Sequence, residues 1–471
     1  MLDPKEFKSD SSEVIQWIDH YLNNITSYPV KSPVHPGDIY RHIPADAPQE
    51  SESLDQIMKD LDQIIMPGIT HWQHPNFHAY FPANSSVESM LAEFITSAIG
   101  AQCMIWDTSP SAAELEQRMM EWLRGAMGIP EKHEGVIQDS ASSASLVALI
   151  TAREVATGFT SNEEGVPNNL RVYCSQETHS SIEKGVAVCG IGKKNLVKIG
   201  VDQQLGMIPG ELESRIKEDI HSGFKPCAVV AAIGTTGTLA VDPLKEIAEI
   251  CKKYNVWLHV DAAYAGTALL LPEYRWMIEG IEQVDSFVFN SHKWMFTNFD
   301  CSVYFVKNAD LLIRTFEVLP EYLKTKSRGL VNDYRDWGVP LGRRFRALKL
   351  WFVIRSFGIK GIQQQLRSHI QLNLNFSEAI RQISGIELDI EPFLNFTCFR
   401  LNPPSPLSTE GLNSLNEKLL EEINKGGKVF LTHTKINGLY TLRMVIGQTY
   451  VTQDHIELAL KEIESAIVRI N

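Results

Sequence analysis

The 471-residue sequence lacks an excess of basic residues. Its 44 Lys and Arg are outnumbered by 57 Asp and Glu, which gives a net charge of −13. Nucleic-acid binding depends on clustered Lys and Arg side chains that neutralise phosphates, so this balance argues against a nucleic-acid partner. The acidic charge favours solubility and carries no information about the fold.

The sequence also lacks any apolar run that approaches the roughly 20 residues needed to span a bilayer, so we expect no membrane partner. Its first ten residues, MLDPKEFKSD, carry too many charges for a secretory signal peptide. The seven cysteines are odd in number and include no C-x-x-C pair, a pattern typical of reduced, buried thiols. We therefore expect a soluble, cytoplasmic protein without a metal site.

Internal repeats and low-complexity tracts are absent as well, and the composition is that of an ordinary globular protein, with 44% hydrophobic and 21% charged residues. Residues 1–80 form the first predicted part, a helical arm with amphipathic helices at 11–25 and 52–66. Five prolines between Tyr28 and Glu50 exclude a continuous helix through the link. Such an arm buries little by itself, so we expect it to pack against another subunit. A cap on the same chain is the open alternative.

Residues 81–345 show short β-rich runs that alternate with helical patterns. The runs lie at 171–174, 227–233, 256–260, 286–290 and 302–306. Alternating β and α elements predict a large α/β domain whose mostly parallel sheet is covered by helices. Residues 346–471 predict a small C-terminal α+β domain, with a helix at 346–385, strands near 396–401, 428–431 and 439–446, and a helix from about 453.

Two polar side chains follow apolar runs of the predicted sheet. Val256–Val260 leads directly into Asp261, and Phe287–Phe289 is followed by the segment NSHKW, which contains Lys293. Ligands of open parallel sheets bind at the carboxyl ends of the strands, where we expect both side chains to lie. Partial desolvation of a lysine at such a place depresses its pKa and frees its amine for Schiff-base chemistry. A carboxylate and an amine in this arrangement are what pyridoxal phosphate (PLP) requires, a partner for the ring nitrogen and an amine for the aldehyde.

Three further segments carry groups suited to a phosphorylated cofactor. Small hydroxyl residues at 139–145 precede an apolar helical stretch, and N–H groups at a helix start hold phosphate well; ordinary N-capping is the alternative. A Gly-Thr-rich turn at 234–238 can deliver a hydroxyl to a cofactor or serve as a plain turn. His179 follows the run at 171–174, where an imidazole can stack on a pyridine ring and move protons near neutral pH.

Together, these segments resemble the group II PLP-dependent amino acid decarboxylases, and most closely the aromatic-L-amino-acid decarboxylases. The motifs run in the family's order over most of the chain: HWQHPNFHAYFP (71–82), SPSAAELEQRMMEW (109–122), 135–153, HSS (179–181), GTT (234–236), HVDAAYAG (259–266), NSHKW (290–294) and DYRDWGVPLGRRFR (333–346). The resemblance implies the PLP-dependent transferase fold (fold type I) and an obligate homodimer with shared active sites. It also implies decarboxylation of an aromatic L-amino acid (Trp, Tyr, Phe or DOPA) to the arylalkylamine and CO2.

The resemblance also implies roles for individual residues. Covalent attachment of the cofactor falls to Lys293, and pairing with its ring nitrogen to Asp261. Stacking on the ring falls to His179, and protonation of the substrate's Cα to Tyr334 on a mobile catalytic loop at about 320–345. Further residues are implied around the cofactor: Ala141, Ser142, Thr236, Ala263, Asn290 and His292. The implied substrate pocket consists of Trp72, Tyr80, Phe81 and Pro82, with Met104 of the partner subunit.

Three positions depart from the pattern of the animal members of this family. Ala83 stands where they have Thr, Asp139 where they have the Gly before the phosphate serines, and Met104 where they have an aromatic residue. Because Asp139 is an awkward neighbour for a phosphate, we expect it to point away or to cap the backbone. Two alternatives stay open. One is an aromatic aldehyde synthase, which couples decarboxylation to oxidative deamination, and the other is a decarboxylase of a non-aromatic L-amino acid.

Overall fold

The computed structural model describes residues 6–318 and 330–470, so part of the predicted loop at about 320–345 lies outside the described residues. The chain divides into two compact units. The terminal unit comprises Met1–Pro82 and Gln371–Asn471, and the central unit comprises Ala83–Ile370. Within the described residues, no helix combines the length and apolar character that crossing a bilayer requires, and no group of three or more His, Cys, Asp or Glu side chains is arranged to hold a metal ion.

The central unit contains a mostly parallel sheet, with the strand order β1-β7-β6-β5-β4-β2-β3 among the described residues. Its strands are β1 (Glu134–Gln138), β2 (Leu170–Ser175), β3 (Leu196–Ile199), β4 (Lys225–Ala232), β5 (Trp257–Asp261), β6 (Ser286–Asn290) and β7 (Ser302–Val306). Neighbouring strands from β3 to β6 pair in parallel, whereas β7 runs antiparallel to both β6 and β1. The predicted mostly parallel α/β sheet is therefore confirmed.

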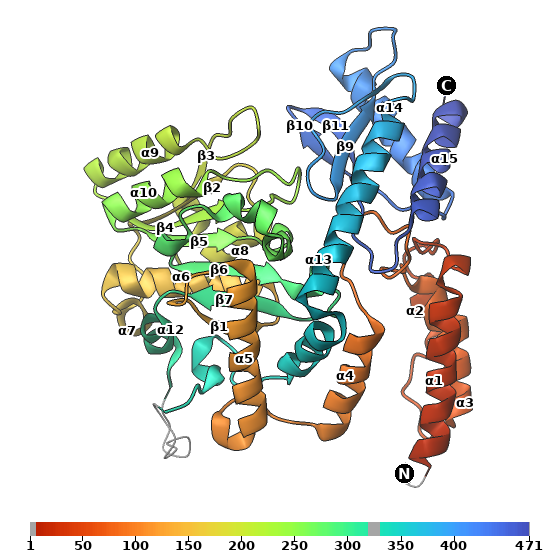
Figure 1. Ribbon diagram of the computed structural model, residues 1–471, viewed down its shortest axis with the longest axis horizontal. Helices are drawn as coiled ribbons and strands as arrows, with labels where there is room; N and C mark the ends of the chain where they lie inside the picture. The colour runs from red at the N-terminus through yellow and green to blue at the C-terminus, as the bar shows by residue number, and fades with distance from the viewer. Residues whose placement is uncertain (1–5, 319–329, 471) are drawn as a thin grey trace. The chain divides into compact units, whose positions relative to one another are not determined.

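Helices cover this sheet (Figure 1), and α6 packs along β4 to β7 while α9 and α10 contact β4. The helices of the unit are α4 (Val87–Ile99), α5 (Pro110–Met127), α6 (Ala141–Thr157), α7 (Ser161–Glu164), α8 (Ser180–Val188), α9 (Pro209–His221), α10 (Leu244–Tyr254), α11 (Ser291–Trp294) and α12 (Ala309–Phe316). Every residue of β5 and β6 is buried. Strands covered on both faces are continuous apolar runs, and this is why these two were visible in the sequence.

All five predicted β-rich runs of the central unit form strands, but two further strands, β1 and β3, were missed. β3 is a four-residue edge strand that is only partly buried, so its sequence shows little hydrophobic pattern. β1 carries Gly135, and a Cβ there would stand 2.7 Å from Cβ of Met120 in α5 and 2.8 Å from Cε1 of Phe305 in β7. The glycine that permits this packing also weakens the strand signal.

The terminal unit combines the N-terminal arm with the C-terminal segment. Its helices are α1 (Phe7–Asn23), α2 (Asp38–His42), α3 (Leu54–Asp60), α14 (Thr409–Lys425) and α15 (Gln453–Ile470). Its antiparallel sheet has the order β10-β11-β9-β8, formed by β8 (Ile386–Glu387), β9 (Phe396–Leu401), β10 (Thr432–Ile436) and β11 (Leu439–Val445). Helix α13 (Arg346–Ile380) begins in the central unit and ends in the terminal unit, with a break in its helical backbone at Gly358.

The predicted strand at 428–431 is wrong, since β10 begins only at Thr432. The apolar residues before it pair with the N-terminal arm: the His78 N–H donates to the Phe430 carbonyl at 3.0 Å, and the Phe430 N–H to the Asn76 carbonyl at 3.2 Å. The arm thus contacts its own chain, as the cap alternative expected. Packing of the arm against another subunit stays a prediction, and α1 leaves Phe7 70% and Ile15 53% exposed.

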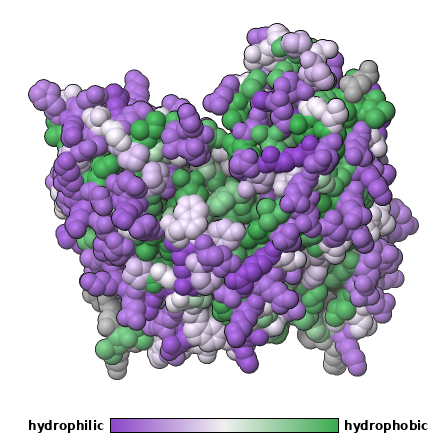
Figure 2. Space-filling model, turned by 45° about the horizontal axis from the view of Figure 1, so that its top comes forward, coloured by the Kyte–Doolittle hydropathy of each residue, from purple (hydrophilic) through white to green (hydrophobic). Residues whose placement is uncertain are grey.

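Hydrophilic residues cover most of the face in view in Figure 2, and apolar residues gather in smaller areas between them. This distribution agrees with a charged fraction of 21% in the sequence. Each of the seven cysteines lies among the described residues and is a buried free thiol, in agreement with the prediction from the sequence.

Candidate active site

The candidate active site lies at the carboxyl edge of β4, β5 and β6. Asp261 ends β5 and pairs in register with Ala232, the last residue of β4. Beyond the strand ends, the Ile233 N–H donates to the Asp261 carbonyl at 2.9 Å, and the Asn290 N–H donates to the Ala263 carbonyl at 3.0 Å. These bonds bring the Gly-Thr turn, Asp261 and Asn290 to one edge of the sheet.

The carboxylate of Asp261 is held in a tightly packed place. The residue is 8% exposed, and its Oδ1 accepts the Ala263 N–H at 3.1 Å. A Cβ on Gly266, in the segment after β5, would stand 2.5 Å from Cβ of Phe289 in β6. This segment therefore lies directly on the neighbouring strand, and its packing limits the orientations open to Asp261.

Lys293 lies in the short helix α11, which directly follows β6. Its main chain is held from two sides: the side-chain amide of Asn84 donates to the Lys293 carbonyl at 2.5 Å, and the Asn84 N–H donates to the His292 carbonyl at 3.0 Å. The next residue, Trp294, stacks on Tyr264 with ring centroids 5.4 Å apart. The lysine is half-buried and starts from a rigid main chain.

His179 is the N-cap residue of α8, and its Nδ1 accepts the Ser181 N–H at 3.2 Å. The proton of the neutral ring is therefore on Nε2. His179 is exposed, but partial desolvation of its ring disfavours the charged form and lowers its pKa below the ordinary value; Asp261 opposes this shift and Lys293 adds to it. The imidazole is thus within electrostatic reach of both the carboxylate and the amine, and it is neutral near neutral pH.

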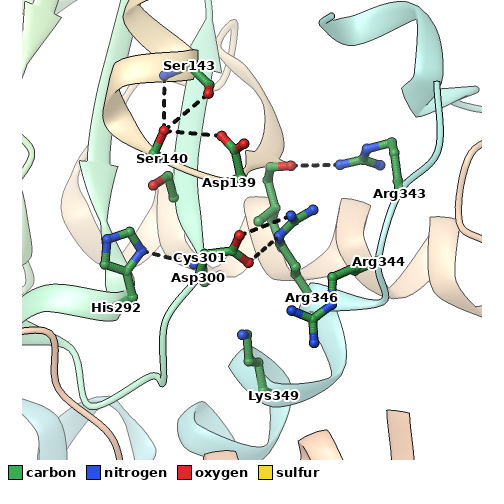
Figure 3. A network of polar contacts seen from close by, with 12 residues as sticks. Asp139, Ser140, Ser143, His292, Asp300, Cys301, Arg343, Arg344, Arg346 and Lys349 are labelled. Carbon is green, nitrogen blue, oxygen red and sulfur yellow. Dashed lines mark hydrogen bonds and ion pairs between the residues drawn. The ribbon is translucent and has the colours of Figure 1, made fainter. Parts of the chain in front are cut away.

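The start of α6 provides the expected helix N-terminus. Ser140 is its N-cap residue, and its Oγ accepts the Ser143 N–H at 3.1 Å (Figure 3). The first two helical residues are Ala141, which is buried, and Ser142, which is exposed. Ordinary N-capping therefore occurs here. Because the cap uses only the Ser143 N–H, the other N–H groups of the first helical turn are not used by it.

Asn290 and His292 complete this edge. Asn290 Oδ1 accepts the Ser302 hydroxyl at 2.6 Å, and His292 Nδ1 accepts the Cys301 N–H at 2.9 Å. Burial, together with the positive charge of Lys293, lowers the pKa of His292 to about 3. His292 is therefore a neutral hydrogen-bonding group at physiological pH.

A network of ion pairs lies beside the start of α6, and it was missed at the sequence level (Figure 3). The Arg346 Nε pairs with Asp300 at 2.8 Å, and the Arg343 guanidinium pairs with Glu116 at 2.7 Å. Two further cations share one carboxylate: Arg344 and Lys349 both lie 2.7 Å from Glu93. The run GRRFR at 342–346 shows in the sequence that positive charges cluster there. The carboxylates that pair with these arginines lie far away in the sequence.

Tyr334 begins the 3-10 helix Tyr334–Trp337 and is only 2% exposed. Its ring meets Trp337 edge-on with centroids 5.4 Å apart, and the Arg343 guanidinium carbon lies 5.0 Å from the ring centroid. Burial raises the pKa of the phenol above its ordinary value. With Asp139 and Arg343, Tyr334 lines a cavity of about 40 Å³. Its catalytic role stays a prediction, and residues 319–329 of the predicted loop lie outside the described residues.

The predicted substrate-pocket residues belong to different units. The terminal unit contains Trp72, Tyr80, Phe81 and Pro82, and there Trp72 and Tyr80 stack with ring centroids 5.8 Å apart. Met104 lies in the central unit, where its carbonyl accepts the Arg335 N–H at 2.9 Å. The assignment of these residues to a substrate pocket stays a prediction. Thr236, also predicted near the cofactor, is exposed in the turn after β4.

Two residues with a role in this geometry were missed in the sequence. One is Asn84, which holds α11 and has no sequence signal beyond its place after the motif at 71–82. The other is His259, whose ring nitrogens lie 2.9 Å from the hydroxyls of Ser145 in α6 and Ser286 in β6. His259 lies two residues before Asp261, so both side chains are on the same face of β5. The alternation of side chains along a strand could therefore have identified His259 from the sequence.

The residues at this edge fit pyridoxal phosphate. They provide an amine (Lys293), a buried carboxylate (Asp261) and a neutral imidazole (His179) whose pKa is affected by the charges of both. They also provide a helix start for the phosphate, next to the small residue Ala141. This set of donors corresponds to the aldehyde, ring nitrogen, ring face and phosphate of that cofactor.

Comparisons with known proteins agree with this set. Residues 36–402 match the family model described as "Pyridoxal-dependent decarboxylase conserved domain". The chain is 39% identical to the aromatic-L-amino-acid decarboxylase of Mus musculus, over 99% of both proteins. It is 38% identical to the phenylacetaldehyde synthase of Arabidopsis thaliana, over 98% of this chain and 96% of that protein.

A solved structure is similar over the same extent. Oryza sativa TDC with PLP and tryptamine superposes with a TM-score of 0.96 and 32% sequence identity, covering 100% of this chain and 99% of that chain. The match to the family model includes the stretch from Ala141 to Lys293, which contains the predicted cofactor residues.

Proposed function

Because the chain belongs to the family of pyridoxal-dependent decarboxylases, we propose that it decarboxylates an aromatic L-amino acid to the arylalkylamine and CO2. The predicted family, its PLP-dependent carboxy-lyase activity and the cofactor are confirmed by the comparisons, whereas the substrate is our proposal. The observation that carries the proposal is the arrangement of Asp261, Lys293 and His179 at one sheet edge, in a chain similar in full length to an aromatic-L-amino-acid decarboxylase.

Bound pyridoxal phosphate supplies an electron sink for the bond that breaks at the substrate's Cα. Lys293 Nζ is the amine that would hold the cofactor and would be replaced there by the amine of the substrate. The negative charge of Asp261 keeps a proton on the ring nitrogen, because an anion close to a base raises the pKa of that base. The packing around β5 and α11 holds both groups in place without further reorganisation.

His179 orients the reacting groups in this proposal. Its ring is neutral, and the Ser181 N–H holds it through Nδ1, so a planar uncharged face is available for stacking on the cofactor. Such stacking, with contacts to the substrate side chain, would orient the substrate's carboxylate for the bond that breaks at Cα. Tyr334 then provides the proton that replaces CO2 at Cα. Burial keeps its phenol protonated and thus able to donate.

An aromatic substrate is supported by the side chains of the motif at 71–82. Trp72 and Tyr80 stack on each other, and Phe77 lies 4.5 Å from Trp72 between ring centroids. We propose that Trp72, Tyr80, Phe81 and Pro82, with Met104 of the partner subunit, line the pocket for the substrate's ring. Aromatic rings bind an aromatic side chain through apolar area and edge or face contacts.

The proposed assembly is a homodimer, and helix α4 supports it. One face of α4 buries Ser89 and Ala92, while another exposes apolar side chains that are between 43% and 58% exposed: Val87, Leu91, Phe94, Ile95 and Ile99. A contiguous apolar helix face of this kind marks an interaction surface, and a second copy of the chain is the occupant we propose. The free buried thiols support the proposed cytoplasmic location.

Light scattering tests the dimer. The wild type should have twice the chain mass of 53.0 kDa, and Leu91→Glu combined with Phe94→Glu should shift it toward the monomer. Ile220→Glu is the control, since it places one glutamate at an exposed apolar residue outside α4, on α9. A wild type that is monomeric at micromolar concentration would refute the assembly.

Product analysis tests the reaction. The purified protein, loaded with PLP, is incubated with L-tryptophan, L-tyrosine, L-phenylalanine, L-DOPA, L-histidine and L-glutamate, and the products are identified by mass spectrometry. An arylalkylamine and CO2 in equal amounts from at least one aromatic substrate supports the proposal. Amine formed only from histidine or glutamate would point to the non-aromatic alternative.

The second candidate function is an aromatic aldehyde synthase, favoured by the 38% identity to the phenylacetaldehyde synthase of Arabidopsis thaliana. That reaction consumes oxygen and releases aldehyde, ammonia and hydrogen peroxide. Two features favour the amine instead, namely the presence of both Tyr334 and His179, since enzymes of the aldehyde type tend to lack one of them. A peroxide yield equal to the CO2 yield would establish the aldehyde reaction.

A further inference from the structure

Asp139 directly precedes Ser140, the N-cap residue of α6 (Figure 3). Its side chain is half-buried, and its Oδ1 lies 3.2 Å from the Ser140 hydroxyl, which donates to it. The expectation was that this carboxylate would point away or cap the backbone. The cap is formed by Ser140 instead, and Asp139 accepts the hydroxyl of Ser140. The negative charge therefore stays at the helix start, next to Ala141 and Ser142.

A helix N-terminus attracts anions because its first N–H groups and the helix dipole present partial positive charge. Asp139 is itself an anion at that end of α6. A phosphate bound to the same N–H groups would be a second anion, and like charges a few ångströms apart repel. The carboxylate thus weakens the electrostatic attraction between the helix N-terminus and a phosphate.

The surrounding cations do not remove this repulsion, because they have carboxylate partners of their own. Arg346 binds Asp300 through two nitrogens, at 2.8 and 3.3 Å. Arg343 pairs with Glu116, and Arg344 and Lys349 share Glu93, at 2.7 Å in each case. With Asp139 included, this network contains four cations and four carboxylates, so it offers a phosphate no net positive charge.

The other predicted neighbours of the phosphate, His292 and Asn290, are uncharged. The pKa of His292 is lowered to about 3 by burial, so its ring is neutral at physiological pH. Asn290 already accepts the Ser302 hydroxyl at 2.6 Å, and its amide carries no charge. A phosphate at this place therefore depends on neutral dipoles. Asp139 adds a negative charge beside it, and the attraction between Asp139 and Arg346 acts without a close ion pair.

We propose that Asp139 limits the affinity of this enzyme for pyridoxal phosphate by opposing the cofactor's phosphate group. The covalent link to Lys293 then contributes more to the binding free energy of the cofactor than the groups around its phosphate do. The inference concerns cofactor binding only, so it rests on membership of the family and not on the proposed substrate. It identifies Asp139 as an affinity-determining residue that can be changed without touching the reacting atoms.

The test measures cofactor affinity in the apoenzyme by absorbance and fluorescence titration. Asp139→Asn removes the charge and keeps an acceptor for the Ser140 hydroxyl, so PLP should bind about threefold to thirtyfold more tightly. Pyridoxal, which lacks the phosphate, should bind with unchanged affinity. The gain for PLP should shrink as salt is added, because screening weakens repulsion between charges that water reaches.

Two further variants control for charge and stability. Asp139→Glu keeps the charge and should bind PLP like the wild type. Asp310→Asn removes a carboxylate from the first turn of another helix, α12, in the same unit and should leave PLP affinity unchanged. Combining Asp139→Asn with Lys293→Ala should preserve the gain for PLP, since the repulsion does not depend on the covalent link.

Unchanged or weaker PLP binding by a folded Asp139→Asn protein would overturn the proposal, and so would an equal gain for pyridoxal. If Asp139 served only to support the cap of α6, Asp139→Asn would lower the melting temperature of the apoenzyme without tightening PLP binding. If the Asn variant fails to fold, Asp139→Ser gives the same comparison, with the same expected tighter binding of PLP alone. None of these readouts depends on which amino acid the enzyme decarboxylates.

Discussion

The side-chain amide of Asn84 donates to the main-chain carbonyl of Lys293 at 2.5 Å, across 209 positions of sequence. The Asn84 main chain also bonds to the residue before the lysine, at 3.0 Å. A lysine has four rotatable side-chain bonds, so the position of its amine is reproducible only if its main chain is fixed. Asn84 thus supports the position of the Lys293 amine although it lies far from Lys293 in the sequence.

Asn84→Ala should therefore impair the enzyme without abolishing it. Loss of one hydrogen bond to a partly buried carbonyl should lower the free energy of unfolding by about 1 kcal/mol. Turnover should fall as well, because Lys293 is held less firmly, while the product stays the same. Urea denaturation and steady-state kinetics measure the two effects. Wild-type stability and turnover together would contradict the supporting role.

Lys293→Ala should abolish turnover, because it removes the amine that we propose holds the cofactor and exchanges with the substrate. Treatment with borohydride followed by mass spectrometry should find PLP attached to the wild-type chain and none attached to the variant. Full activity in the variant would refute the assignment of Lys293.

Asp261→Asn should reduce turnover strongly while PLP still binds. A nearby opposite charge shifts a pKa by roughly 1 to 3 units, so removing it should lower the protonated fraction of the ring nitrogen, and with it the rate, by about 10- to 1,000-fold. The absorbance of bound PLP verifies cofactor loading in the same sample. A near-normal rate would remove the electrostatic argument for Asp261.

Tyr334→Phe should shift the product from amine toward aldehyde. The variant keeps the ring that packs on Trp337, with 5.4 Å between centroids, but lacks the hydroxyl that we propose as the proton donor. Stability should change little, while the ratio of aldehyde and peroxide to amine should rise severalfold, as quantified by mass spectrometry and a peroxide assay. An unchanged amine yield would count against proton donation by Tyr334.

Acid should destabilise the protein through its buried histidines, and His369 allows a test. It is fully buried, its Nδ1 accepts the Trp294 Nε1–H at 3.0 Å, and burial lowers its pKa to about 3. The neutral ring is therefore the folded form. The stabilisation that comes from the neutral ring is complete above the pKa of an unfolded histidine, about 6.5. It is lost as the pH falls, by roughly 1.4 kcal/mol of unfolding free energy per pH unit.

His369→Gln removes this titration and keeps an acceptor for Trp294. Below about pH 6.5, the free energy of unfolding of this variant should fall less steeply with acidification than that of the wild type. Urea titrations at several pH values measure both slopes. Equal slopes for the two proteins would show that His369 titrates normally in the folded state.

The sequence by itself determined the features that depend on local pattern. Continuous apolar runs identified β5 and β6 because strands buried on both faces consist of such runs. Asp261 and Lys293 were found because a polar residue directly after such a run falls at a strand end, where ligands bind. The hydroxyl-rich start of α6 was visible for the same local reason. The combination of these motifs was specific enough to indicate the family.

Only the tertiary structure decided which distant groups meet. Arg343 pairs with Glu116 across 227 positions, and Asn84 with Lys293 across 209, and no local pattern predicts such partners. The apolar residues before β10 pair with the N-terminal arm instead of extending the strand. Local propensity acts over a few residues, whereas these contacts depend on how packed elements bring separate segments together. The charge balance around Asp139, and with it the proposed limit on cofactor affinity, exists only in the folded chain.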